Sequence, residues 1–105
     1  MENSFETVVT ELIVQAGDAR ILALQAVREG RRQNWDEVDK LTKECDSAMV
    51  KAHEVQTELI QRELNGAPVE MNLLMVHAQD HVMNAMTVRD LAAEMLSMLG
   101  SKTEY

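Results

Sequence analysis

The scarcity of residues that interrupt helices is the feature that most limits what this chain can fold into. Its 105 residues include one proline, Pro68, and four glycines, at positions 17, 30, 66 and 100. A β-sandwich or β-barrel of this length needs many turns and is usually rich in strand-forming aromatic residues, but only 3% of these residues are aromatic. The sequence therefore favours an all-α fold, and its length predicts a single domain, residues 1–105.

Three of the four glycines divide the chain into helical patterns of similar length. Gly30, Gly66 and Gly100 each follow an amphipathic run, and Pro68 comes shortly after Gly66. Glycine just beyond a helix, with proline soon after, is a common C-terminal signal. The predicted helices cover residues 4–29, 35–64 and 69–99. Short connections between long helices predict an up-down-up antiparallel three-helix bundle.

The expected starts of the first two helices carry a matching signal. Asn3 and Asn34 each stand three residues before an acid, Glu6 and Glu37 respectively, which is the spacing of a capping box. We therefore predict that the two asparagines cap their helices.

The first two predicted helices each have an apolar stripe. In the first helix it consists of Phe5, Val8, Leu12, Ala16, Ala19, Ala23 and Val27. In the second it consists of Val38, Leu41, Cys45, Ala48, Ala52, Val55 and Leu59. Because Cys45 lies on a stripe, we expect a small core residue rather than a nucleophile. Gly17 lies inside the first helix, where glycine costs about 1 kcal/mol relative to alanine, and a close helix contact is one compensation.

The third predicted helix is apolar around its whole circumference. Its main stripe consists of Leu74, Ala78, His81, Ala85, Val88, Ala92, Met95 and Leu99. Its other faces carry Leu73, Met75, Val76, Val82, Met83 and Met86. A helix of this kind must be buried on more than one side, and two neighbours in one subunit cover only about half of it. We therefore predict an oligomer that packs through the third helices.

Charge and cysteine content exclude several classes of function. The formal net charge is −8 and no basic run is present, so nucleic acid and anionic membranes are poor partners. A single cysteine excludes an intramolecular disulfide framework and fits a reducing compartment. We see neither a signal peptide nor a stretch of about 18 apolar residues that could span a membrane. We therefore expect a cytoplasmic protein.

Three residues of the third helix can carry chemistry. His77, Asp80 and His81 stand at i, i+3 and i+4, where side chains of one helix come within reach of each other. Three interpretations are open: a satisfied polar core with histidine bonded to Asp80, a zinc or iron site, and a nucleophilic histidine. Copies of Asp80 brought together in a symmetric oligomer would repel unless protons or a metal ion neutralised them.

The string His77-Ala78-Gln79-Asp80-His81, followed by Val82-Met83, resembles the active-site segment of the lactose/cellobiose-class enzyme IIA proteins of the sugar phosphotransferase system. Two further segments are similar to that family, and so is a short connecting turn. They are residues 16–20, residues 52–59 and residues 65–68. The similarity runs in order through essentially the whole chain, which makes it far more specific than the histidine string alone.

This resemblance implies a three-helix subunit that assembles as a homotrimer. It implies that His77 accepts a phosphoryl group from the phosphocarrier protein HPr and passes it to a cysteine of a cognate IIB protein. Gln79 would support the site through a hydrogen bond, and His81 would be either a buried structural histidine or a direct participant. Asp80 would lie at the trimer centre, where three copies hold one divalent metal ion, with magnesium favoured for oxygen ligands. His53 is expected to be structural.

The main hypothesis is therefore a phosphohistidine carrier that relays phosphate during disaccharide uptake without binding sugar. The alternative is a metal-stabilised helical oligomerisation module without phosphotransfer, in which the same cluster only assembles subunits. The sequence leaves lactose, cellobiose and chitobiose open as the sugar that is served.

Overall fold

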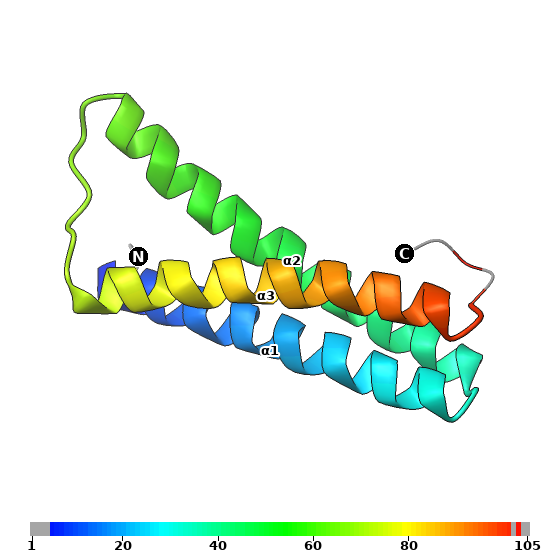
Figure 1. The fold of residues 1–105 in the computed structure, drawn as a ribbon. Coiled ribbons are helices and arrows are strands. Elements are labelled where there is room, and N and C mark those ends of the chain that lie inside the picture. Colours follow the sequence, from blue (N-terminus) through cyan, green and yellow to red (C-terminus); the bar gives the residue numbers. More distant parts are fainter. Residues whose placement is uncertain (1–4, 102, 104–105) are drawn as a thin grey trace.

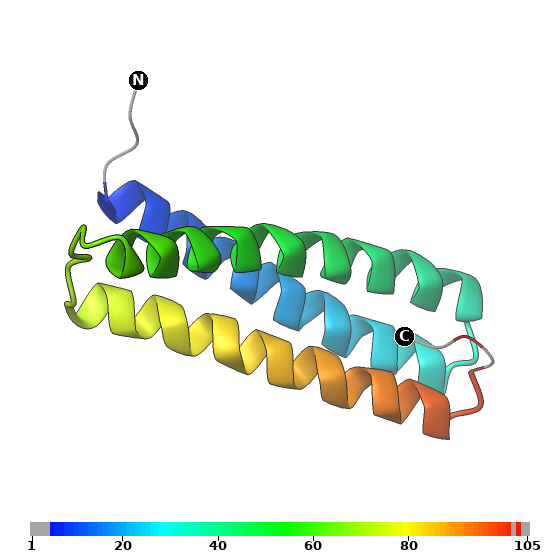
Figure 2. The ribbon, with the colours of Figure 1, turned by 90° about the horizontal axis from the view of Figure 1, so that it is seen from above.

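The computed structural model describes residues 5–101 and residue 103, and it consists of three long helices joined by short connections (Figure 1). They are α1 (Phe5–Arg31), α2 (Trp35–Leu64) and α3 (Leu73–Met98). The helices run up, down and up, so α1 and α3 are parallel (Figure 2). The molecule measures 48 × 24 × 22 Å. The predicted all-α three-helix architecture is confirmed.

The helix α1 holds the bundle together because it packs along both of the others, whereas α2 and α3 touch each other much less. Figure 1 shows the C-terminal half of α2 diverging from α3 toward the connection between them. The contact between α1 and α3 is lined by small residues. On α1 these are Ala16, Ala19 and Ala23, and on α3 they are Ala78, Ala85 and Ala92, all buried in one cluster. Small side chains at a helix interface let the two backbones approach closely.

The buried face of α2 agrees with the predicted stripe, except that Val55 is only half-buried. On α1 the core takes Val9 instead of Val8, and it continues through Ala26 to Gly30. On α3 the prediction was wrong at five positions. The structure buries Met75, Val82 and Leu96 where Leu74, His81 and Met95 were expected, Val88 is only half-buried and Leu99 is exposed. At three of these positions the buried residue is one place later than predicted. Because α3 packs against two neighbours, the predicted stripe lies at one edge of its buried face.

Two of the expected stop signals are confirmed and one is wrong. Gly66 has φ 84° and Gly100 has φ 102°, the left-handed conformation that glycine adopts without strain. Gly30, however, lies inside α1. In the connection between α1 and α2, the residue with positive φ is Gln33. A Cβ atom on Gly30 would lie 2.7 Å from Cδ2 of Leu96. The role of Gly30 is therefore close packing of α1 against α3.

Gly17 behaves in the opposite way. A Cβ atom built there would meet nothing within 4 Å, so close packing inside the subunit does not explain the glycine. Gly17 lies between Val14 and Ile21 on α1, which are 48% and 52% exposed. Position 17 is therefore open, with two exposed apolar residues one turn away and the exposed Asp18 and Arg20 nearby.

The helix starts differ from the capping predictions. Asn34 precedes α2, but its side chain makes no capping bond and donates to Glu29 instead. The other predicted cap, Asn3, lies outside the described residues. The helix α3 begins at Leu73 rather than at residue 69, because Oδ1 of Asn72 accepts a hydrogen bond from the backbone N–H of Met75 at 2.9 Å.

The contrast between the two helical glycines predicts opposite effects of the same substitution. Gly30→Ala should lower the free energy of unfolding by about 1–3 kcal/mol, because the added methyl group overpacks against buried Leu96. Gly17→Ala should leave it unchanged or raise it by up to about 1 kcal/mol, through helix propensity alone. Urea unfolding followed by circular dichroism measures both. A loss for Gly17→Ala as large as that for Gly30→Ala would contradict the subunit packing described here.

Candidate functional site

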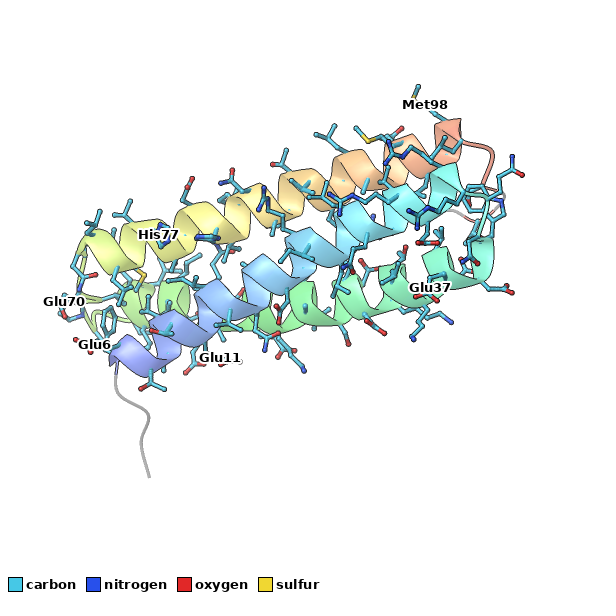
Figure 3. The ribbon with its side chains drawn as sticks, turned by 90° about the horizontal axis from the view of Figure 1, so that it is seen from below. Glu6, Glu11, Glu37, Glu70, His77 and Met98 are labelled. Carbon is cyan, nitrogen blue, oxygen red and sulfur yellow. The ribbon has the colours of Figure 1, made fainter. Side chains whose placement is uncertain are left out.

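The N-terminal half of α3 brings two histidines into direct contact. His77 is exposed and His81, one turn later, is half-buried. Their Nε2 atoms are 3.1 Å apart, and the rings meet edge to face with centroids separated by 4.4 Å. One Nε2 atom must donate the hydrogen and the other must accept it. Figure 3 shows His77 in the half of the bundle that also carries Glu6 and Glu70. The pair therefore presents an exposed imidazole that a second imidazole orients.

Asp80 does not join the histidine pair. Its carboxylate is exposed, and Oδ2 accepts a hydrogen bond from Nδ2 of Asn84 at 3.4 Å. No polar or charged side chain is buried among residues 5–101 and 103, so a buried polar core around Asp80 is absent from the described subunit. Over the same residues no three histidine, cysteine or acidic side chains gather as a possible metal site. A zinc or iron site built from one described chain is therefore not supported.

Gln79 faces α2, on a different side of α3 from the histidines. Its Oε1 accepts a hydrogen bond from Nε2 of Gln56 at 2.8 Å, and its Nε2 donates to Sδ of Met75 at 3.5 Å. The amide thus joins α2 to the turn of α3 that lies between His77 and His81. Nothing in the sequence pattern marks Gln56 as a partner of Gln79, although Gln56 lies in the family-like segment 52–59. His53, in the same segment, is exposed.

Arg20 of α1 has a neighbourhood that the sequence did not indicate. The structure puts it beside α3, in a recess of about 340 Å³ between the two helices. The recess is lined by Arg20, His81, Asn84, Thr87 and Val88. Amino-acid pattern alone does not reveal this neighbourhood, because Arg20 and His81 lie on different helices. Asp18, two residues earlier, is exposed.

The outer face of α3 is largely apolar and uncovered. Its exposed apolar residues are Leu73 (85%), Val76 (52%), Met83 (53%), Leu91 (52%) and Met98 (86%). Asp80 falls among them at helical spacing. A face of this kind on a small protein marks an interaction surface. None of the helices found between residues 5 and 101 has the length and apolar character needed to cross a bilayer.

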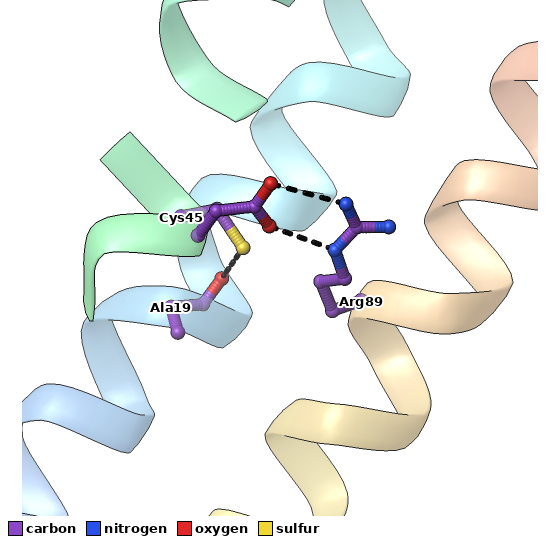
Figure 4. Close-up of polar contacts among 4 residues, drawn as sticks. Ala19, Cys45 and Arg89 are labelled. Atoms are coloured by element: carbon purple, nitrogen blue, oxygen red, sulfur yellow. Dashed lines mark hydrogen bonds and ion pairs between the residues drawn. The ribbon is translucent and has the colours of Figure 1, made fainter. Parts of the chain in front are cut away.

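Cys45 is a core residue, as predicted, and not a nucleophile. The side chain is 2% exposed and Sγ donates to the backbone oxygen of Ala19 at 3.2 Å (Figure 4). Burial, assisted by the neighbouring Asp46 carboxylate and opposed by Arg89, raises the pKa of the thiol to about 11. Almost no thiolate is therefore present near neutral pH.

Arg89 and Asp46 form the ion pair that links α3 to α2. Nε of Arg89 lies 2.8 Å from Oδ1 of Asp46, and a second guanidinium nitrogen lies 3.1 Å from Oδ2 (Figure 4). The hydrogen bond to Asp46 raises the pKa of the Arg89 guanidinium. This two-point contact and the Gln56–Gln79 bond supplement the sparse packing between α2 and α3.

Comparison with known proteins agrees with the geometry. The family described as "PTS system, Lactose/Cellobiose specific IIA subunit" matches residues 7–100. The chain belongs to this family. The lichenan-specific phosphotransferase enzyme IIA component of Bacillus subtilis is 41% identical over 104 residues, which cover 99% of this chain and 94% of the relative. The N,N'-diacetylchitobiose-specific EIIA component of Escherichia coli K12 is 33% identical, covering 89% of this chain and 80% of the relative.

A solved structure extends the agreement to three dimensions. The crystal structure of the cellobiose-specific enzyme IIA from Bacillus anthracis superposes with a TM-score of 0.88 at 38% identity, covering 94% of this chain and 91% of that one. The protein is thus a IIA component of the phosphotransferase system, in the lactose/cellobiose class of sugar uptake.

The raised pKa of Cys45 predicts a specific loss of stability at alkaline pH. The Cys45 thiol has a pKa of about 11 in the folded IIA protein, whereas its pKa in the unfolded chain is the ordinary 9.0. The stability contributed by the neutral thiol is complete below pH 9 and is lost as the pH rises toward 11. Urea unfolding of the wild type and of Cys45→Ala should therefore show a stability difference that shrinks with pH. A difference that stays constant from pH 7 to 10.5 would contradict this.

Proposed function

We propose that this IIA protein is a phosphohistidine carrier. His77 takes a phosphoryl group from HPr in the cytoplasm and passes it to the cysteine of a cognate IIB protein during disaccharide uptake. The observation that carries the proposal is the exposed imidazole of His77, held by a second imidazole at 3.1 Å on a rigid helix. Partner proteins can reach such a group directly. The IIA protein itself need not contact the sugar.

The chemistry is in-line transfer in two steps. A ring nitrogen of neutral His77 attacks the phosphorus as the bond to HPr breaks, and the IIB cysteine sulfur later attacks the same phosphorus as the bond to His77 breaks. Such transfers depend on positioning and on stabilisation of the charge spread over the phosphoryl oxygens. His81 contributes directly by donating from Nε2 to the His77 ring, which fixes its tautomer.

Gln79 acts in this proposal as support rather than as a reacting group. Its hydrogen bond from Gln56 anchors the turn between the two histidines to α2, so the helix that carries the nucleophile keeps its place. The resemblance predicts a supporting hydrogen bond for Gln79. We propose that this bond acts by holding α3 against α2 rather than by contacting His77.

We also infer that the protein works as a homotrimer whose subunits meet through the outer face of α3. The exposed apolar residues of that face support this. One exposed Asp80 per chain, set in the apolar face, would bring three carboxylates together. An oxygen-only donor set of this kind fits a divalent ion such as magnesium. The ion would neutralise the carboxylates and would take no part in phosphotransfer.

Phosphorylation tests the carrier function. Incubation with phosphoenolpyruvate, enzyme I and HPr should add one acid-labile, base-stable phosphate to each chain, and His77→Ala should add none. His81→Gln should slow the transfer at least about 10-fold, because the orienting imidazole is lost. His53→Ala removes an exposed histidine of α2 and is the matched control, with an unchanged rate. Absence of phosphate on the wild type would support the oligomerisation module instead, and persistence of the phosphate in His77→Ala would rule out His77 as the residue that carries it.

Sedimentation tests the trimer. Sedimentation equilibrium of the wild-type protein with magnesium should give a molecular mass three times that of one chain. Asp80→Leu should keep the trimer when metal is removed with EDTA, because three repelling carboxylates are replaced by apolar groups. Asp90→Leu replaces an exposed acid on another side of α3 and is the control. Its trimer should still require the metal ion. A monomeric wild type, or loss of the trimer in Asp80→Leu, would contradict the proposed assembly.

A further inference from the structure

We propose that Arg20 of α1 binds the phosphoryl group that His77 carries, which makes the recess between α1 and α3 an anion-binding site. This inference rests on the proposed phosphorylation of His77. It assigns a role to the arginine of the segment at residues 16–20, which the fold alone does not explain.

The first step is the position of Arg20 beside the histidine pair. Arg20 and His81 line the same recess, and Nε2 of His81 lies 3.1 Å from Nε2 of His77. A phosphoryl group on that nitrogen of His77 would take the place of the contact with His81. The phosphoryl group would then lie next to the His81 ring, which itself lines the recess together with Arg20.

The second step is the lack of a counter-ion for Arg20. The α1 positions three and four residues away hold Ala16, Gly17, Ala23 and Leu24, and none is charged. Among the residues that the structure describes, Arg20 has no hydrogen bond or ion pair. By contrast, Arg32 pairs with Glu29 and Arg89 pairs with Asp46. The Arg20 guanidinium is thus exposed, charged and free to bind an anion.

Gly17 keeps the approach to this guanidinium open. It precedes Arg20 by one helical turn, and a Cβ atom there would meet nothing within 4 Å. Because α1 and α3 run in the same direction, moving from Arg20 to Gly17 follows the direction from His81 to His77. Position 17 therefore adds no side chain to the α1 surface one turn before Arg20, in the direction that leads toward His77.

The third step is charge balance. The chain carries a net charge of −8, and Asp80 stands three residues from His77, so a phosphoryl group arrives in acidic surroundings. Among the other recess residues, the Thr87 hydroxyl donates to the backbone oxygen of Met83 and the Asn84 amide donates to Asp80. Arg20 supplies the positive charge, and the planar fork of a guanidinium matches phosphoryl oxygens.

The expected consequence is a more stable phosphorylated state. Replacing Arg20 with glutamine should shift the exchange of phosphate between HPr and the IIA protein toward phospho-HPr by about 3- to 10-fold, the size expected for a charge-assisted contact near the surface. Arg20→Lys retains the positive charge but lacks the planar guanidinium. Its equilibrium constant for phosphate exchange should therefore lie between those of the wild type and Arg20→Gln. The ³¹P resonance of the phosphohistidine should also move in Arg20→Gln.

Arg28→Gln is the matched control, because it removes the same charge from an exposed position two turns further along α1, in a different recess. The equilibrium is read by mass spectrometry of mixtures with HPr, and circular dichroism checks that each variant is folded. An Arg20→Gln variant that matches Arg28→Gln in equilibrium and in ³¹P shift would overturn the proposal.

A second measurement separates this inference from the carrier function. Inorganic phosphate titrated into the unphosphorylated wild type should shift the NMR signals of His81 and of the Arg20 side chain, and Arg20→Gln should abolish the His81 shift. If the wild type takes up no phosphoryl group from HPr, the carrier function fails while this titration still tests the recess. A wild-type protein whose His81 signal ignores phosphate would overturn the anion site.

Discussion

The close contact between α1 and α3 through their alanines is the interaction on which the rest of the structure depends. Alanines recur on both facing helices and are fully or almost fully buried, so the two backbones lie near each other over most of their length. Because the large apolar side chains of α3 are not needed to fill this contact, several of them point outward. The same packing that completes the subunit therefore leaves α3 with an uncovered apolar face.

The candidate site lies at the border between these two faces of α3. His81 lines the recess that α1 closes, while His77, one turn earlier, is exposed and within 3.1 Å of it. A nucleophile must be open to partner proteins and yet held in one orientation, and this border supplies both conditions. The parallel course of α1 adds Arg20 from a second helix, so the packing that builds the core also brings a cation to the histidine pair.

Sequence patterns predicted the buried residues well for a helix that buries only one side. The stripe of α2 was correct almost throughout because its other faces are charged. On α3 the pattern failed at His81, which was placed on the core stripe and lies at its edge, since an apolar circumference does not indicate which side faces inward. The glycines failed for a related reason. Gly30 packs closely against α3, whereas a Cβ atom at Gly17 in mid-helix would meet nothing within 4 Å. The sequence of α1 alone shows neither, because both depend on where the other helices lie.

The sequence by itself determined three long helices, singled out His77 as a candidate nucleophile and indicated membership of a phosphotransferase family, because periodicity, turn residues and motif spacing are local properties. Only the tertiary structure decided that His77 pairs with His81 rather than with Asp80, that Gln79 faces Gln56, and that Arg20 shares a recess with the histidines. The last two relations depend on the rotation and stagger of one helix against another, whereas the first depends on the side-chain rotamers of two residues one turn apart on α3. The packing of all three helices sets these quantities together, and no single segment encodes them.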